Sequence, residues 1–370
     1  MKKWFLHIWA CLLLLVGVAC TDDAEPMQTD YGKKVRLELQ LAMPAGNALS
    51  RVAAYEDGQI LENYIDFFDE NKYRIYFFNS ENRYIARFIP SEVMMGLGNQ
   101  YLLYNLEGDV PEALIPQSGT TDFKIVVLGN WPDYDDSALI PGTTTIDDVC
   151  HAEWATFEYW SDFELDRFSG KLIPFYGVHA YTGIEFKSDE VVTLSDPVTM
   201  LRAMAKVEVT IPDGGLDFES VSICRYNSEG YCAPSGVHSQ ADYGQSNPSD
   251  PDYLTSLHLV DNANETDEKE LALQETKVNG KETWIAYLPE YQNKGVENNF
   301  SYIKVKLTEE EEIRTIYFAE YTNGQTSNAD EIRMDIKRNN IYRFAVHASP
   351  LLFAVSVDQW EWGGKVHIDM

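Results

Sequence analysis

The chain has 370 residues, of which 29 are basic and 59 acidic, and its formal net charge at pH 7 is −30. A charge this negative repels phosphate backbones and argues against nucleic acid as a partner. With 45% apolar and 13% aromatic residues the chain can fill packed cores, which excludes disorder, and its length favours two domains.

The chain begins with an export signal. Two lysines precede a mostly apolar run from Trp4 to Ala19, and Cys20 follows where cleavage is expected. The run is shorter than the roughly 20 residues of a membrane-spanning helix. We therefore predict a signal peptide at 1–19, lipidation of Cys20 and a lipid-anchored linker at 20–32. An ordinary secretory signal in which Cys20 is incidental is the alternative.

Acidic residues follow directly after this cysteine, at Asp22 and Asp23. They resemble the export signal by which Bacteroidetes lipoproteins reach the outer face of the outer membrane. This resemblance implies a surface-exposed protein of the cell outer membrane.

Strand signals dominate from residue 33 onward. Apolar residues from Val35 to Leu41 alternate with polar ones, the period of two that a half-buried strand requires. Similar segments lie at 73–78, 83–88, 123–128, 206–211, 220–224, 284–288, 302–307, 315–321, 342–346 and 352–357. Many short strands predict an all-β fold class of antiparallel β-sandwiches. The composition change near 195–203 places two domains at 33–200 and 201–370.

Turn dipeptides separate several of these segments. Asp213-Gly214, Asn279-Gly280 and Asn323-Gly324 favour tight hairpins, because both residue types tolerate positive φ.

The cysteines allow one disulfide. Of the five, Cys11 belongs to the leader and Cys20 to the lipid, which leaves the odd number formed by Cys150, Cys224 and Cys232. Cys224 and Cys232 flank a hairpin-like interval, so either a disulfide between them or two buried thiols fits the sequence.

Two acidic stretches are the best local cases for a metal or a nucleophile. The members of the first are Asp147, Asp148, Cys150, His151 and Glu153, and those of the second are Asp133, Asp135 and Asp136. Adjacent residues of a strand point to opposite faces, and the spacing of a calcium-binding EF-hand loop is missing. We prefer a helix-starting loop for the first stretch and a solvated loop for the second, and we predict no metal, no cofactor and no catalytic residue.

A series of short sequence motifs, called phrases below, spans nearly the whole mature chain. Its members are the leader, the strand at 35–41, Ile65 with Tyr73-Arg74-Ile75-Tyr76-Phe77-Phe78, Ile125-Val126-Val127-Leu128-Gly129-Asn130-Trp131-Pro132, Ile173-Pro174-Phe175-Tyr176-Gly177, 201–209, 338–344 and Val357-Asp358-Gln359-Trp360. In this order and spacing they resemble the Bacteroidales fimbrillins, a family whose members assemble type V pili.

The resemblance implies two transthyretin-like β-sandwich domains. It also implies assembly by strand exchange, in which removal of the first strand opens a groove that a neighbouring subunit fills. The partners would be other fimbrial subunits, the outer membrane through the lipid anchor, and a host or bacterial surface ligand.

Arg51 is the candidate cleavage point for that removal. It follows the first predicted strand in a stretch of small residues that a trypsin-like protease could enter. Anchor subunits of the family are not cleaved, so a solvated loop residue in a permanently anchored protein is the alternative.

The C-terminus is a candidate donor strand. Phe353, Val355 and Val357 alternate with small residues, and Val366 and Ile368 resume the alternation after Gly363-Gly364. An ordinary last hairpin packed in its own domain is the alternative.

A surface glycan-binding lipoprotein is the main rival function. Trp131, Trp154, Trp160, Trp284, Trp360 and Trp362 are the tryptophans that invite it. Aromatic residues also fill the cores of most β-proteins, so the composition alone does not decide. An extracellular hydrolase would need a paired acid and base in a cleft, and the sequence singles out no such pair.

Overall fold

The computed structural model describes part of the chain in detail. The described residues are 35–44, 61–97, 101–131, 136–150, 172–187, 190–211, 217–227, 233–234, 270–278, 281–293, 300–308, 311–319, 333–348 and 351–359. The chain divides into two compact units, residues 1–34 and 35–370, and the first lies wholly outside the described residues.

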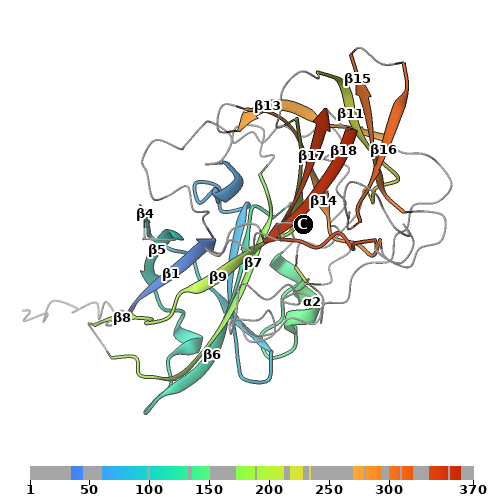
Figure 1. The fold of residues 1–370 in the computed structure, drawn as a ribbon. Coiled ribbons are helices and arrows are strands. Elements are labelled where there is room, and N and C mark those ends of the chain that lie inside the picture. Colours follow the sequence, from blue (N-terminus) through green and yellow to red (C-terminus); the bar gives the residue numbers. More distant parts are fainter. Residues whose placement is uncertain are drawn as a thin grey trace, which may run out of the picture. The chain divides into compact units, whose positions relative to one another are not determined.

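The first half of the second unit forms a nine-stranded sheet (Figure 1). Its strands are β1 (Arg36–Pro44), β2 (Tyr73–Phe78), β3 (Tyr84–Arg87), β4 (Glu92–Leu97), β5 (Tyr101–Asp109), β6 (Thr121–Gly129), β7 (Phe175–Ile184), β8 (Val191–Thr193) and β9 (Val198–Arg202). They follow the order β3-β2-β6-β7-β9-β1-β5-β4, with β8 pairing beside β1. The first strand of the chain therefore lies inside the sheet rather than at its edge.

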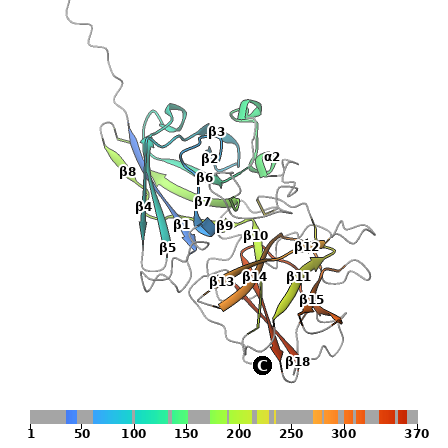
Figure 2. The same cartoon turned by 90° about the horizontal axis from the view of Figure 1, so that it is seen from above.

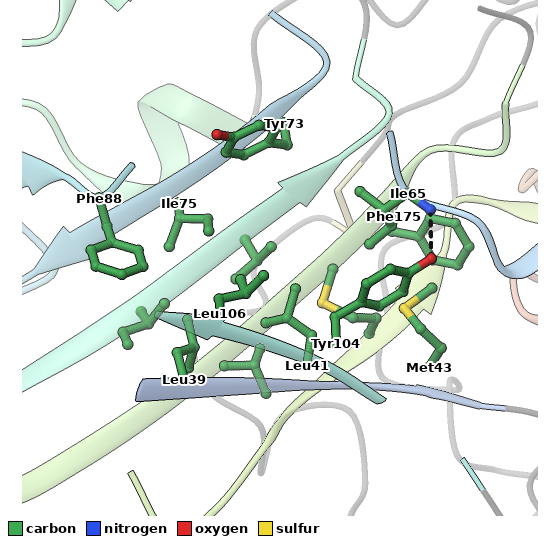
Figure 3. Packing of buried hydrophobic residues seen from close by; sticks show 14 of the residues in the cluster. Leu39, Leu41, Met43, Ile65, Tyr73, Ile75, Phe88, Tyr104, Leu106 and Phe175 are labelled. Atoms are coloured by element: carbon green, nitrogen blue, oxygen red, sulfur yellow. Dashed lines mark hydrogen bonds between the residues drawn. The ribbon is translucent and has the colours of Figure 1, made fainter. Parts of the chain in front are cut away.

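Side chains from both ends of this order meet in one hydrophobic cluster. Ile75 of β2 and Ile125 of β6 share it with Leu39 of β1 and Leu106 of β5, and all four are fully buried. The sheet thus folds over itself, and the two layers enclose a common core (Figure 3).

The second half of the unit contains two further sheets (Figure 2). One is five-stranded in the order β13-β14-β10-β17-β18, with β10 (Met204–Thr210), β13 (Gln274–Val278), β14 (Lys281–Pro289), β17 (Asn340–Ala348) and β18 (Leu351–Gln359). The other is four-stranded in the order β12-β11-β15-β16, with β11 (Phe218–Cys224), β12 (Glu270–Ala272), β15 (Tyr302–Leu307) and β16 (Ile313–Tyr317).

These two sheets pack against each other through a second hydrophobic cluster. Val207 and Phe344 of the five-stranded sheet share it with Ile223 and Val305 of the four-stranded one. The apolar positions alternate along β15, where Ile303, Val305 and Leu307 are buried and their neighbours are not, so each sheet turns one face inward.

The prediction of an all-β sandwich fold is confirmed, with two differences in detail. The sheets are mainly antiparallel, but β1 pairs in parallel with β8 and β9, and β10 pairs in parallel with β17. The segments predicted at 73–78 and 302–307 have the observed bounds, whereas β4, β5, β7, β8, β9, β12 and β13 had no predicted counterpart. The strand β9 is buried at all five positions, so it lacks the alternation that a sequence reader detects.

Local signals account for several connections. Val278 lies opposite Lys281 in the β13–β14 ladder, so only Asn279-Gly280 separates the two strands, as the dipeptide predicts. Thr145 caps helix α2 (Ile146–Cys150), because the Asp148 amide donates to its Oγ1 at 3.1 Å and its own amide donates to Asp148 Oδ2 at 2.8 Å.

Among the described residues, the other helical elements are single turns, η2 (Leu61–Asn63), η3 (Glu112–Leu114) and η4 (Asp136–Ala138). No helix in the described part of the chain has the length and apolar character needed to cross a membrane.

Candidate functional site

The strand β1 occupies the position that strand exchange would use. All nine of its residues pair with β5 in antiparallel register, from Arg36 opposite Asp109 to Pro44 opposite Tyr101. On its other side it pairs in parallel with β8 over Arg36 to Glu38 and with β9 at Leu41 and Ala42. Its removal would leave backbone groups of β5 and β9 without partners along a groove in the sheet.

The inner face of β1 supplies four apolar side chains to the first core. Leu37, Leu39, Leu41 and Met43 each have 0% of their surface exposed. Figure 3 shows Leu39, Leu41 and Met43 on the same side of the strand, directed toward the layer that carries Ile75. The groove beneath β1 is therefore a row of four apolar sites at alternate positions, which is the chemistry of an extended apolar strand.

The outer face of β1 is polar and loosely held. Arg36 forms an ion pair with Glu107 at 3.0 Å, with 43% and 22% of the two side chains exposed. Thr193 Oγ1 donates to Glu38 Oε2 at 2.9 Å. Exposed pairs of this kind contribute little stability, so the inner face holds the strand in place.

The chain that follows β1 in the described residues, 61–66, is fixed by polar side chains. The Ile65 amide donates to the Tyr104 hydroxyl at 3.1 Å, which Figure 3 marks. Asn130 Nδ2 donates to the Tyr64 carbonyl at 2.6 Å, and the Asp66 amide donates to Asn130 Oδ1 at 2.9 Å. Asn130 has a φ of 53°, a left-handed conformation that asparagine tolerates, so this residue of the Gly129-Asn130-Trp131 phrase has a positional role.

Glu62 in the same segment belongs to a buried ionic network with the five-stranded sheet. Lys206 Nζ lies 2.7 Å from Glu62 Oε1 and 2.9 Å from Glu208 Oε1. Tyr287 donates its hydroxyl to Glu62 at 2.7 Å, and Arg343 Nε lies 2.9 Å from Glu208 Oε2. The Lys206, Glu62 and Glu208 side chains are 4%, 8% and 8% exposed, so these charges depend on each other rather than on water.

The network shifts the ionisation of its members. Burial acts to lower the pKa of Lys206, but the Glu62 and Glu208 carboxylates more than offset it and the pKa is raised. Burial likewise acts to raise the pKa of Glu208, whereas Lys206 and Arg343 lower it overall. Both groups are therefore charged over the physiological range.

Arg202, the last residue of β9, also holds residues 61–66 in place. Its side chain is fully buried, and it donates to Asn63 Oδ1, to the Glu62 carbonyl at 3.2 Å and to Asn339 Oδ1 at 3.1 Å. Sequence reasoning did not single out Glu62, Arg202 or Lys206. For Arg202 and Lys206 the available signal was their charge among apolar neighbours in the segment 201–209.

The predicted donor residues lie on a strand that is already paired. Phe353, Val355 and Val357 belong to β18, whose nine residues pair with β17 in antiparallel register. The strand lies at the edge of the five-stranded sheet, with β17 as its neighbour in the strand order. Within 351–359, β18 therefore forms a hairpin with β17, which is the alternative to a donor strand that the sequence analysis named. Val366 and Ile368 lie outside the described residues.

The other predicted site residues are mostly undescribed. Cys20 and Arg51 lie outside the described residues, so lipidation and cleavage stay predictions. Cys224 is buried, and burial is the main cause that raises the pKa of its thiol. Its predicted partner Cys232 lies outside the described residues, and the pairing stays a prediction as well.

The first acidic stretch has no catalytic geometry in the residues that the structure describes. Cys150 is buried in a third hydrophobic cluster, which it shares with Trp131 and Tyr176. Burial raises the pKa of its thiol to about 12, so it is neutral and a poor nucleophile. His151 and Glu153 lie outside the described residues. Among the described residues, no group of acidic, histidine and cysteine side chains is arranged to hold a metal ion.

Asp136 of the second stretch is not simply solvated. Its carboxylate accepts from Arg74 Nε at 3.0 Å, from Arg87 Nη1 at 2.5 Å and from the Tyr76 hydroxyl at 2.5 Å. Arg74 is buried, so this residue neutralises a buried cation and is not available as an oxygen ligand for calcium. Asp133 and Asp135 lie outside the described residues.

The described aromatic residues do not form a flat platform. Trp131 is 1% exposed, and its Nε1 donates to the Phe175 carbonyl at 2.9 Å. Phe300 meets the rings of Tyr302 and Tyr317 at interplanar angles of 60° and 63°, so these rings are tilted rather than coplanar. Trp154, Trp160, Trp360 and Trp362 lie outside the described residues.

Comparison with known proteins finds solved structures that resemble this one, but no match by sequence. No family model matches the sequence, and no curated protein matches it. The C-terminally truncated tip fimbrial protein Mfa3 of Porphyromonas gingivalis is 12% identical with a TM-score of 0.47, over 88% of this chain and 100% of that chain. A fimbrial assembly protein of Parabacteroides distasonis is 12% identical with a TM-score of 0.46, over 88% of this chain and 96% of that one.

Both neighbours are fimbrial proteins. Because both TM-scores are below 0.5, the two neighbours assign no activity to this chain.

Proposed function

We propose that this chain is a lipid-anchored protein of the outer cell surface that serves as a fimbrial subunit or an accessory adhesin. It joins other fimbrial subunits by β-strand exchange, and it is not an enzyme. The observation that carries the proposal is the place of β1, the first strand of the chain, between β9 and β5 in the interior of the nine-stranded sheet.

That place makes β1 both removable and replaceable. An internal strand near the chain start has one covalent connection to the rest of the domain, which follows Pro44 and contains Arg51. A cut there severs β1 from the downstream chain while every other strand keeps its connections. The vacated groove would offer main-chain partners on both sides and four apolar sites below, which suits an extended segment of a neighbouring subunit.

The domain organisation proposed with this function is two transthyretin-like sandwiches at 33–200 and 201–370. One observation supports a division close to this point. The nine-stranded sheet ends with β9 at Arg202 and the other two sheets begin with β10 at Met204, so only Ala203 separates them.

Membrane attachment and the donor segment complete the proposal. Cys20 would carry the lipid and keep the protein at the surface until the chain is cut. The C-terminal segment, from Phe353 to Ile368, would serve as the donor strand, for which β18 must leave β17. Its position at a sheet edge supports this, because an edge strand separates without opening the sheet interior.

Two measurements test the proposal. Electron microscopy should show fibres on cells that carry the gene and none, or altered ones, on cells that lack it. Mass spectrometry of assembled surface protein should find an N-terminus after Arg51. An N-terminus at Cys20 in assembled material removes cleavage from the proposal, and unchanged polymer formation after deletion of 351–370 removes C-terminal donation.

A further inference from the structure

We infer that cutting the chain does not itself release β1: the severed strand stays seated in the sheet and leaves only when another extended apolar strand displaces it. This inference rests on the proposed strand exchange and describes its control. The nick would prepare the subunit, and the incoming strand would trigger the release.

The described strand pairing of β1 is made with strands that lie far from it in the sequence. All nine residues pair with β5, and shorter ladders tie the strand to β8 and β9. The four inner side chains, from Leu37 to Met43, are fully buried in the first core. None of these interactions depends on a covalent link after Pro44.

The downstream side of the cut is held just as independently. Residues 61–66 are fixed by Tyr104, by Asn130, by the fully buried Arg202 and by the ion pair of Glu62 with Lys206 at 2.7 Å. A break within 45–60 therefore leaves all of these contacts of the described residues intact on both sides of the cut. It only converts an intramolecular association of β1 into an intermolecular one, which changes effective concentration rather than affinity.

Unassisted departure would uncover far more than one strand. The neighbouring strands β5 and β9 would lose their main-chain partners, and core residues such as Leu106, Val198 and Met200, all fully buried, would face water. A second strand entering from one end replaces these contacts pair by pair, so the groove is never empty. Displacement is the faster path for this reason.

The groove also defines which strand can enter. It requires apolar side chains at the four alternate positions now taken by Leu37, Leu39, Leu41 and Met43. It accepts polar side chains at the half-buried positions of Arg36, Glu38 and Gln40, whereas Ala42 is also buried. A charge at an inner position would be buried without a partner, whereas the same charge at Gln40 would stay at the half-buried outer face.

The test uses the mature chain with a site-specific protease sequence inserted after Ser50. The protein is cut to completion and passed over a native sizing column, and the protein peak is analysed by mass spectrometry. We expect the N-terminal fragment to co-elute with the main body and to separate only in denaturant. Early separation of the fragment, with no added strand, would overturn the inference.

Synthetic peptides covering residues 34–45 then probe displacement. The native peptide should release the fragment at a rate that rises with peptide concentration. The Leu39→Asp peptide should act about 10–100-fold more slowly, since it loses the burial of one leucine and gains a buried charge. The Gln40→Asp peptide is the matched control and should act like the native one.

The outcomes separate this inference from the proposed function. If the fragment leaves on its own and labelled peptide still binds the emptied sheet, the retention of β1 is wrong while strand exchange stands. If no peptide enters at any concentration, whether or not the fragment has left, the proposed strand exchange fails, and displacement fails with it.

Discussion

Lys206→Met removes the cation at the centre of the buried network that joins the 61–66 segment to the five-stranded sheet. Its Nζ lies 2.7 Å from Glu62 and 2.9 Å from Glu208, and only 4% of the side chain is exposed. Methionine keeps the volume of the stem but leaves two buried carboxylates without this partner. Breaking a buried pair in this way costs about 3–5 kcal/mol.

The residual contacts place the expected loss at the lower end of that range. Glu62 keeps the hydroxyl of Tyr287 at 2.7 Å, and Glu208 keeps Arg343 at 2.9 Å. We expect Lys206→Met to lower the free energy of unfolding by about 3 kcal/mol, measured by urea titration with circular dichroism.

Two companion variants make the prediction specific. Glu62→Gln combined with Lys206→Met leaves Glu208 paired with Arg343 and no unpaired charge, so the double variant should be more stable than Lys206→Met alone. Lys306→Met breaks a partly exposed pair with Glu219, with 33% and 49% of the side chains exposed, and should cost under about 1 kcal/mol. A loss for Lys206→Met as small as that of Lys306→Met would refute the reasoning.

Three further predictions concern pH, packing and thiol reactivity. Because the pKa of Glu208 is lowered in the folded chain, its stabilisation is full above its unfolded pKa and is lost as pH falls through the folded value. Between about pH 7 and about pH 3 the urea midpoint should fall less steeply for Glu208→Gln than for the wild type. Gly177→Ala should lower the free energy of unfolding by about 1–3 kcal/mol, since a Cβ there would lie 2.8 Å from a Val198 methyl; an unchanged urea midpoint would contradict this close approach. Burial raises the pKa of Cys150 to about 12, so peptide mapping should find it unalkylated in native protein at about pH 8 and alkylated in denaturant.

Strands with a clean alternation are the part of the fold that the sequence predicts well. The strands at 73–78 and 302–307 have the predicted bounds, and the hairpin across Asn279-Gly280 has the predicted two-residue loop. Strands buried on both faces were missed: β9 has no exposed position, and its role depends on layers contributed by other parts of the chain. Parallel pairing of β1 with β8 and β9 was also missed, because it joins segments more than 150 residues apart.

The candidate site divides in the same way. Alternation marked the first strand, and the order of phrases suggested that this strand is exchanged. The polar groups that fix residues 61–66 could not be found from the sequence. Lys206 and Glu208 alternate with apolar residues, a pattern that places them on a solvated outer face, yet the contacts of Glu62 and Tyr287 bury them.

The sequence by itself determined the all-β character and the apolar face of the first described strand, and it predicts an export signal, because each of these follows from local composition or from a period of two. The tertiary structure alone decided that this strand lies inside a sheet, between β5 and β9, and that buried ions hold the chain after it. Both depend on partners far away in the sequence. The residues around a charged side chain do not indicate which distant residue will neutralise it. The residues of a strand likewise do not indicate which strand will pair with its edge.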